Sequence, residues 1–199
     1  MPVPPPILTK QFYESMVNTL FESGINLNFA PVLDLDYGEG TIISAQRRSF
    51  SSDPDNIIKH ARIFINAHKQ KNIITCAKHF PGLGSASGDT HEGLTDITDT
   101  WTVKDMIPFD KLIQNNDLDT VMVSHAFDKK LDPNYPSSLS QNIITKMLRN
   151  DLGFEGVVIC DDPSMRAISD HYSLEETFKL MLDAGVDLFC LGNNLIFDP

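Results

Sequence analysis

A short stretch near the middle of the chain carries side chains that could do chemistry. The run Lys78-His79-Phe80-Pro81-Gly82 is followed by Asp89 and His91. Residues 73–77 before it are apolar and predict a buried strand, whereas the residues after it are rich in Gly, Ser and Thr and predict a surface loop. A cation and an imidazole at a strand end, with a carboxylate and a second imidazole on the next loop, can bind a polar ligand and transfer a proton.

Polar side chains also end the other predicted strands. These strands are residues 25–35, 73–79, 120–125, 156–161 and 187–191. The side chains at their ends are those of Asp34, Asp36, Lys78, His79, Ser124, His125, Asp161, Asp162, Asn193 and Asn194. Because parallel strands present their carboxyl ends at one face, we expect these groups to lie together. For Asp34 and Asp36, loop capping and substrate contact are equally good interpretations; for Asp162, capping is favoured. His125 is a candidate for the site or for the core beneath it.

Amphipathic segments alternate with these strands and predict helices. The segments are residues 9–23, 53–71, 104–115, 140–151 and 173–184. Three of these segments have a clear apolar face that we expect to be buried. In residues 9–23 the face is Phe12, Met16, Val17, Leu20 and Phe21, and in residues 53–71 it is Ile57, Ala61, Phe64, Ile65 and His68. In residues 173–184 it is Leu174, Phe178, Met181 and Leu182. Ser173 with Glu176 forms a capping-box pattern at the start of the last helix. Alternating strands and helices predict a parallel sheet with right-handed crossovers.

The fold class that these elements predict is α/β, of the (β/α)8 TIM-barrel type. A glycine-rich nucleotide-binding turn and a Walker-type phosphate loop are both absent from the sequence, which disfavours an open nucleotide-binding sheet. A complete barrel has eight strands in about 250 residues, and the pattern here yields five strands in 199 residues. We therefore expect one domain over residues 1–199 that is a partial barrel, with strands missing at both ends.

Composition bounds the partners and the compartment. The formal net charge of -11 disfavours nucleic acid and anionic membrane surfaces as partners. No apolar run approaches the ~20 residues of a membrane span, and no signal peptide precedes the first helix. We expect a cytoplasmic protein, or a periplasmic or secreted one if a leader precedes residue 1. Cys76, Cys160 and Cys190 are odd in number and lack metal-site spacing, which favours reduced packing residues.

Several blocks of the sequence together resemble glycoside hydrolase family 3, in its β-N-acetylglucosaminidase branch. The first block is Lys78-His79-Phe80-Pro81-Gly82 with Gly84, followed by Asp89-x-His91. The others are the run from Gly24 to Asp34, Arg48-x-Phe50 with Ser52-Asp53-Pro54, the run from Leu152 to Val157, and Asp161-Asp162-x-Ser164-Met165. The blocks follow the order of the family and extend over residues 24–194.

The resemblance implies a retaining hydrolysis of terminal β-linked N-acetylglucosamine. It implies Asp161 as the nucleophile, His91 as the general acid/base and Asp89 as its orienting partner. It also implies that Lys78, His79 and Arg48 bind the sugar, and His125 is retained as a weaker substrate-binding candidate. The implied substrate is a small carbohydrate, an N-acetylglucosamine-containing glycan or a muropeptide from peptidoglycan turnover. Neither a cofactor nor a metal is expected.

These roles are chemically consistent with one another. Retaining hydrolysis needs a carboxylate nucleophile and a proton donor on either side of an oxocarbenium-like transition state. An imidazole with an ordinary pKa near 6.5 can donate that proton near neutral pH. A neighbouring carboxylate fixes the tautomer of the imidazole and favours its charged form.

The sequence departs from the family pattern at three places. The family usually has His where Leu83 stands, and Pro163 replaces an apolar residue after the two aspartates. An earlier Asp-Gln-Glu-Gly-Gly block, whose Asp binds the sugar, would precede residue 1. From these departures we expect altered loop contacts, an altered direction of Asp161, and little or no activity of this chain by itself.

Two other functions fit the same residues. His79, Asp89, His91, His125 and Asp161 could form the metal site of an amidohydrolase-like barrel, although Lys78 would place a cation beside the metal. A barrel fragment that binds sugar or protein without catalysis is the second alternative. Because a partial barrel leaves strand edges unpaired, we also expect self-association through those edges.

Overall fold

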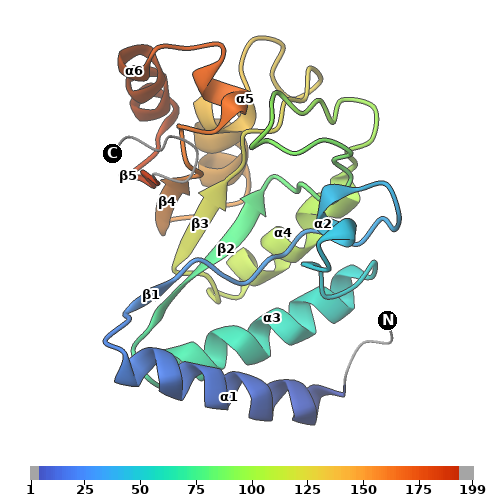
Figure 1. Ribbon diagram of the computed structural model, residues 1–199, viewed down its shortest axis with the longest axis vertical. Helices are drawn as coiled ribbons and strands as arrows, with labels where there is room; N and C mark the ends of the chain where they lie inside the picture. The colour runs from blue at the N-terminus through green and yellow to red at the C-terminus, as the bar shows by residue number, and fades with distance from the viewer. Residues whose placement is uncertain (1–4, 193–199) are drawn as a thin grey trace.

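The computed structural model describes residues 5–192, and its centre is a parallel sheet. The strands are β1 (Leu27–Asn28), β2 (Ile74–Phe80), β3 (Thr120–Val123), β4 (Val157–Cys160) and β5 (Leu188–Phe189). They lie in the order β1-β2-β3-β4-β5, and every neighbouring pair is parallel. In the described part of the chain β1 pairs only with β2 and β5 only with β4, so the curled sheet stays open (Figure 1). The predicted partial (β/α) barrel is confirmed.

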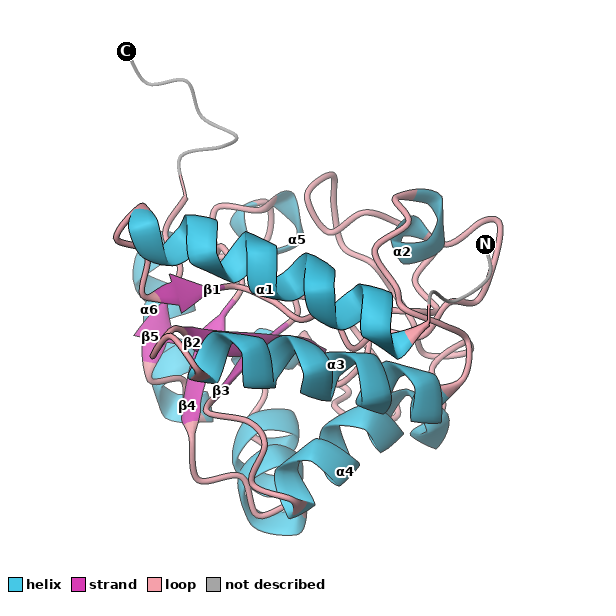
Figure 2. Ribbon diagram, turned by 90° about the horizontal axis from the view of Figure 1, so that it is seen from below, coloured by secondary structure: helices cyan, strands magenta, loops and turns pink. Residues whose placement is uncertain are grey.

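Helices connect the strands, and the predicted helical segments are all helical. The helices are α1 (Pro6–Glu22), α2 (Ile42–Ala45), α3 (Pro54–Lys69), the 3-10 helix η1 (Val103–Met106), α4 (Ile107–Gln114), the 3-10 helix η2 (Ser137–Leu139), the π-helix η3 (Asn142–Asp151), α5 (Arg166–Ser169) and α6 (Leu174–Ala184). Figure 2 shows α1 and α3 side by side, with α4 beyond α3. The short elements α2, η2 and α5 were not predicted, because a single turn has too few residues to show a periodicity.

The two faces of the sheet contribute to different apolar clusters. Ala77, Val121 and Val158 occupy one row of the strand register and are buried in the main core with the helices. Cys76, Met122 and Ile159 are buried in a small separate cluster with Cys190 packed against it. Side chains alternate between the faces of a strand, so consecutive strand residues contribute to two different clusters. All three cysteines are free thiols.

The sequence pattern predicts the buried face of α3 in full and those of α1 and α6 only in part. All five predicted core residues of α3 are buried. In α1, Phe12 and Phe21 are 65% and 55% exposed, because the helix packs on α3 through Thr9, Tyr13 and Val17, four residues apart. In α6 the buried residues are Thr177, Met181 and Ala184, and Leu174 and Leu182 are exposed. Apolar residues on two adjoining helical faces do not reveal which face a neighbour covers.

The predicted helix at residues 140–151 is a π-helix. Its backbone bonds span five residues, as in Lys146 N to Gln141 O and Leu152 N to Met147 O. The Ser140 hydroxyl accepts from the Ile143 amide at 3.1 Å and so caps the start of this helix. Ile143, Ile144 and Leu148 are buried. Amphipathic spacing does not separate this rare helix from an α-helix over so short a length.

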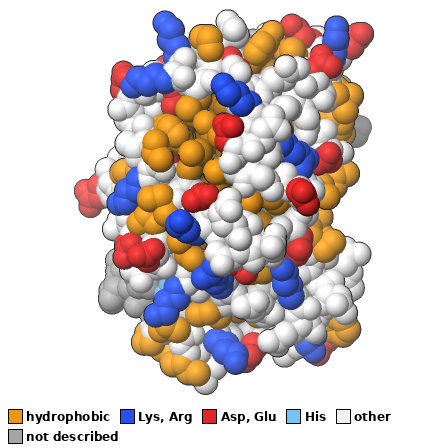
Figure 3. Space-filling view, turned by 180° about the vertical axis from the view of Figure 1, so that it is seen from behind, with side chains coloured by type: hydrophobic (Ala, Val, Ile, Leu, Met, Phe, Trp, Pro, Cys, Tyr) orange, Lys and Arg blue, Asp and Glu red, His pale blue; other side chains and the backbone are white. Residues whose placement is uncertain are grey.

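The surface carries both signs of charge. On the face opposite that of Figure 1, basic and acidic side chains are interspersed with hydrophobic ones (Figure 3). None of the helices in the described part of the chain is long and apolar enough to cross a membrane. The Pro-rich start at residues 1–4 and the strand-end residues Asn193 and Asn194 lie outside the described residues.

Candidate functional site

The carboxyl end of β2 places two predicted site residues at the same edge of the sheet. The register of β2 with β3 shifts between Lys78 and Phe80, so His79 is an extra residue with no partner in β3. Such bulges turn side chains toward new directions and are frequent beside active sites. Lys78 is half-buried and His79 is buried. Burial lowers the pKa of Lys78, and repulsion from Arg48 adds to that effect, whereas Asp161 opposes it.

His79 lies between a carboxylate and a guanidinium. Its Nδ1 is 2.6 Å from Asp34 Oδ2, and its Nε2 is 3.2 Å from Arg48 Nη2. Asp34 has no exposed surface. Arg48 comes from the loop after α2 and is half-buried. The structure thus brings three residues from different segments into one linear arrangement at the end of β2.

Asp161 follows β4 at the same edge of the sheet. Its amide donates to the Val123 carbonyl at 3.1 Å, and its Oδ1 accepts from the Asp162 amide at 2.9 Å. Burial raises the pKa of Asp161, but His79, His125, the Asp162 amide and Lys78 together bring that pKa below its ordinary value. A half-buried carboxylate kept ionised among cationic and N–H groups is suited to nucleophilic attack.

The neighbouring carboxylate, Asp162, has a structural role. Asp162 is buried, and its Oδ1 and Oδ2 accept from the amides of Ser164 at 2.9 Å and Gly192 at 3.1 Å. Pro163 is buried between the residues of this turn. The contacts of Asp162 are those of a loop cap, which the sequence analysis favoured.

His125 lies beneath the site and not on its surface. Its Nδ1 is 2.7 Å from Ser138 Oγ and its Nε2 is 2.9 Å from the Asp162 carbonyl, and the residue has no exposed surface. A carbonyl only accepts, so Nε2 carries the hydrogen and Nδ1 accepts from the Ser138 hydroxyl. Burial lowers the pKa of His125. In this geometry His125 fixes the backbone beside Asp161, and a substrate-binding role for it remains a prediction.

The second imidazole and its carboxylate are paired on the loop after β2. His91 Nδ1 is 2.7 Å from Asp89 Oδ1, which also accepts from the His91 amide at 2.9 Å. Burial raises the pKa of Asp89, but the two His91 hydrogen bonds outweigh it and lower that pKa overall, with help from Arg48. The His91 side chain is 52% exposed, so its free nitrogen is accessible to a ligand.

The loop that carries Asp89 and His91 has its own apolar cluster. Leu83, Ala86 and Ile97 are buried in it with Ile43 and Ala126. Leu83 is the position where the resembled family usually has His; here its side chain packs inside the loop and its amide donates to Asp34 at 2.7 Å. The loop is therefore anchored at its base by packing and by a buried carboxylate.

Gly82 allows the chain to turn sharply at the end of β2, close to Asp105. Its φ is +122°, and a Cβ at this position would lie 2.6 Å from Asp105 Cβ. Both the backbone conformation and the lack of space restrict this position to glycine. The Gly82 amide donates to the His79 carbonyl at 2.8 Å, which fixes the turn directly after the bulge.

The sequence did not decide whether Asp34 caps a loop or contacts the substrate, and it did not identify Ser138 as the partner of His125. Asp36 is a loop cap, since it accepts from the Gly38 amide at 2.9 Å and also from the Ser44 hydroxyl. Asp34 instead accepts from three N–H groups of the segment 79–83. A carboxylate directly after a buried apolar run was the available signal, but only the fold shows which residue it faces.

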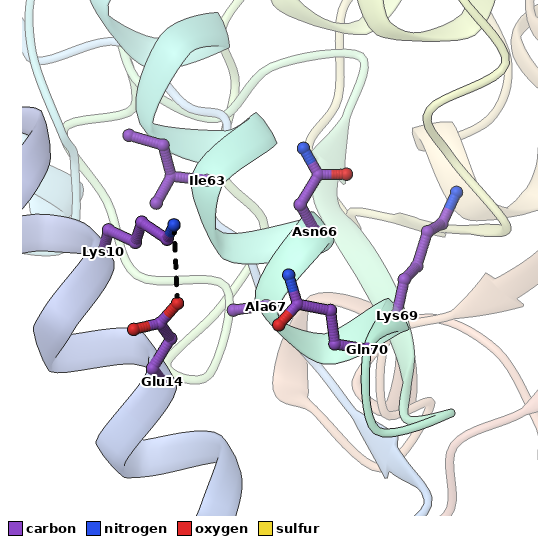
Figure 4. Close-up of a pocket in the computed structure, with 7 residues that line it drawn as sticks. All are labelled: Lys10, Glu14, Ile63, Asn66, Ala67, Lys69 and Gln70. Atoms are coloured by element: carbon purple, nitrogen blue, oxygen red, sulfur yellow. Dashed lines mark ion pairs between the residues drawn. The ribbon is translucent and has the colours of Figure 1, made fainter.

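The residues considered as metal ligands are not arranged as a metal site. Among residues 5–192 no group of three His, Cys, Asp or Glu side chains is placed to hold an ion. Both ring nitrogens of His79 and of His125 already have hydrogen-bond partners. A groove of about 580 Å³ lies elsewhere, between α1 and α3, and Lys10 and Glu14 pair across one helical turn beside it (Figure 4).

Comparison with known proteins identifies a family. The model of the glycosyl hydrolase family 3 N-terminal domain matches residues 5–196. A beta-hexosaminidase of Photobacterium profundum is 39% identical over 184 residues, which are 90% of this chain and 53% of that protein. The chain spans about half the length of the curated relatives that it matches.

Solved structures show the same fold. The beta-N-acetylglucosaminidase of Thermotoga maritima superposes with a TM-score of 0.80 at 33% identity, over 94% of this chain and 40% of that chain. The beta-N-acetylhexosaminidase of Beutenbergia cavernae superposes with a TM-score of 0.87 at 28% identity, over 96% of this chain and 58% of that chain.

Proposed function

This chain belongs to glycosyl hydrolase family 3, and we propose that it hydrolyses terminal β-linked N-acetylglucosamine residues with retention of configuration. The observation that carries the proposal is Asp161, an ionised and half-buried carboxylate at the same edge of the sheet as Lys78 and His79, with Arg48 held against His79. The names of the relatives support the sugar: beta-hexosaminidase and beta-N-acetylglucosaminidase.

In the proposed reaction Asp161 attacks the anomeric carbon while the bond to the leaving oxygen breaks. A covalent glycosyl-enzyme forms, and water then cleaves it in the second step. His91 gives its proton to the leaving oxygen and later takes one from the attacking water. Asp89 holds the ring through Nδ1 at 2.7 Å, so Nε2 is the nitrogen that transfers the proton.

Lys78 and Arg48 are the proposed ligands of the sugar hydroxyls. Both are half-buried, and their charges act on Asp161 and Asp89 respectively. A guanidinium has five N–H donors in a rigid plane, and within the described residues Arg48 uses two contacts, with His79 and Gln46. The remaining donors are free for hydroxyl groups of a small glycan or a muropeptide.

Covalent labelling tests the proposal directly. A 5-fluoro-N-acetylglucosaminyl fluoride should transfer one sugar to Asp161, because the fluorine at C5 slows both steps while the good fluoride leaving group keeps the first step fast enough for the adduct to accumulate. Mass spectrometry of the peptide that contains residues 157–165 would locate the adduct. A single transfer per chain suffices, so slow steady turnover does not hide the result.

Two variants and a chelator sharpen this test. Asp161→Asn should abolish labelling, because an amide is a poor nucleophile, whereas Asp162→Asn should still be labelled. Labelling should persist in excess chelator, because the proposed steps use only side chains. An adduct on Asp162, or chelator-sensitive labelling, would contradict the proposal. Sugar binding without any adduct would favour a non-catalytic binding domain.

A further inference from the structure

A fully buried carboxylate lies behind the residues of the proposed site. Asp34 has no exposed surface, and both of its oxygens face groups of the segment 79–83. Its Oδ1 accepts from the amides of Leu83 at 2.7 Å and His79 at 3.3 Å. Among residues 5–192, its Oδ2 faces a single group, the Nδ1 of His79, at 2.6 Å. Each oxygen of this carboxylate therefore has a defined partner.

These contacts determine which ring nitrogen of His79 carries the hydrogen. An ionised carboxylate only accepts hydrogen bonds, so Nδ1 must donate to Asp34. The Arg48 guanidinium only donates, so Nε2, at 3.2 Å from Arg48 Nη2, must accept. The ring is thus the Nδ1–H tautomer, donating to the carboxylate on one side and accepting from the guanidinium on the other.

We propose that Asp34 is a positioning residue that selects the tautomer of His79 and through it holds the Arg48 guanidinium at the strand ends. The consequence for the sugar rests on the proposed function, in which Arg48 binds the substrate. The consequence for the tautomer does not, because it follows from the hydrogen-bond donors and acceptors of the three side chains alone. Asp34 acts through His79 and touches no substrate atom.

Replacing one atom tests this role. In Asp34→Asn the side-chain oxygen must face the amides of Leu83 and His79, since both of those groups donate. The new NH2 group then faces His79 Nδ1, which must become the acceptor. The hydrogen moves to Nε2, directly opposite the donors of Arg48, and the contact between His79 and Arg48 is lost.

The primary measurement is the tautomer itself. Long-range 1H–15N correlation spectra of the histidine-labelled protein at neutral pH should show His79 as Nδ1–H in the natural chain and as Nε2–H in Asp34→Asn. Asp36→Asn removes a nearby loop-capping carboxylate without contact to His79 and should leave the tautomer unchanged. An Nε2–H ring in the natural chain, or an unchanged tautomer in Asp34→Asn, would overturn the proposal.

A second variant covers the case in which Asp34→Asn does not fold. Arg48→Met removes the donor to Nε2 and leaves Asp34 in place, so His79 should remain Nδ1–H. A change of tautomer in Arg48→Met would show that Arg48, and not Asp34, selects it, and would overturn the proposal.

The kinetic measurement uses the fluorinated N-acetylglucosaminyl fluoride. Asp34→Asn should reduce the second-order labelling rate by about tenfold or more, the expected effect of losing one charge-assisted hydrogen bond. Asp34→Asn with Arg48→Met should be no slower than Arg48→Met alone. If the double variant is slower than Arg48→Met by the full factor that Asp34→Asn causes alone, Asp34 does not act through Arg48 and the proposal is overturned. The two proposals can fail separately. If neither the natural chain nor any variant is labelled, but the tautomers change as stated, the proposed function is wrong and the selection of the tautomer by Asp34 is supported.

Discussion

The amide of Ala167 donates a hydrogen bond to the carbonyl of Thr90 across 3.2 Å. Thr90 is buried and stands between Asp89 and His91 on the loop after β2. Ala167 lies in the first turn of α5, shortly after Asp161. The amides of a first helical turn lack partners within the helix, so this donor is free to bind the loop. One backbone contact therefore links the segment of the proposed acid/base to that of the proposed nucleophile.

We expect Ala167→Pro to loosen the loop without unfolding the domain. Proline lacks the N–H group but fits the first turn of a helix, as Pro108 does at the second position of α4. Loss of one hydrogen bond should increase exchange of the loop amides about two- to tenfold. The amides of Glu92 and Gly93, which both donate to Asp89 O, are the probes for hydrogen-exchange mass spectrometry.

Arg166→Pro is the matched control for that change. It places proline one residue earlier, after Met165, whose ψ of 142° suits a residue before proline. The Ala167 amide remains, so loop exchange should stay as in the natural chain. Equal loosening in both variants would show that proline in α5, and not the Thr90 contact, affects the loop.

His91→Gly should reduce hydrolysis in a manner that depends on the leaving group. Loss of a general acid costs about 10²- to 10⁴-fold where the leaving oxygen needs a proton, and much less for an activated aryl glycoside. The measurement is kcat/KM against the pKa of the leaving phenol, whose dependence should become steeper. His171→Gly, an exposed histidine outside the site, is the control. Equal losses for good and poor leaving groups would contradict proton donation by His91.

Local sequence was sufficient for the place and order of the five strands, for α3 and for the position of Lys78 and His79 at a strand end, but it overestimated the length of β1, which is only Leu27–Asn28, and of β5, which is only Leu188–Phe189. These features depend on apolar runs, on Asp53, which accepts from the Asp55 amide as a helix cap, and on glycines after helices. The cap role of Asp162 likewise depends on near neighbours, such as Ser164 two residues later.

What could not be predicted depends on contacts between distant segments. Asp34 and His79 are separated by 45 residues, and nothing near residue 34 indicates that an imidazole will face it. The exposure of Phe12 has the same cause, since α3 covers another face of α1. The partners of the His125 ring also come from distant segments, Ser138 and the Asp162 carbonyl, which its place after a strand does not predict.

Folding stability should fall as the pH drops below about 6.5, the ordinary pKa of histidine. Burial lowers the pKa of His125, His68 and His60 in the folded chain. The unfolded chain therefore binds more protons than the folded chain below that pH, and each group removes up to ~1.4 kcal/mol per pH unit. Urea unfolding at pH 7.5 and 5.5 should show the lower midpoint at pH 5.5.

A variant identifies the source of this pH dependence. His60→Gln removes one titrating group, so the midpoints at the two pH values should lie closer together than in the natural chain. Asp105 acts in the opposite direction, because burial raises the pKa of its carboxyl and its stability contribution falls as pH rises. The comparison of His60→Gln with the natural chain is therefore more informative than the pH dependence of either protein alone. If the two urea midpoints differ by as much in His60→Gln as in the natural chain, His60 is not a source of the pH dependence.

The open sheet leads us to expect self-association. Among the described residues β1 and β5 each pair on one side only, so backbone N–H and C=O groups are unpaired at both edges. Apolar side chains accompany the β5 edge: Leu188 is 50% and Leu191 is 65% exposed. Unpaired edges with exposed apolar residues favour pairing with another chain. Light scattering should give a mass above the 22.2 kDa of one chain, increasing with concentration.

Leu188→Lys should reduce this association, because a charge on an edge strand opposes pairing of edges. Leu174→Lys is the matched control, since Leu174 is 60% exposed at the start of α6 and lies outside both edge strands. If association depends on the sheet edge, only Leu188→Lys should move the mass toward 22.2 kDa. Equal effects of the two lysines would point to general surface hydrophobicity, and a natural chain that remains monomeric at all concentrations would show that the edges do not pair.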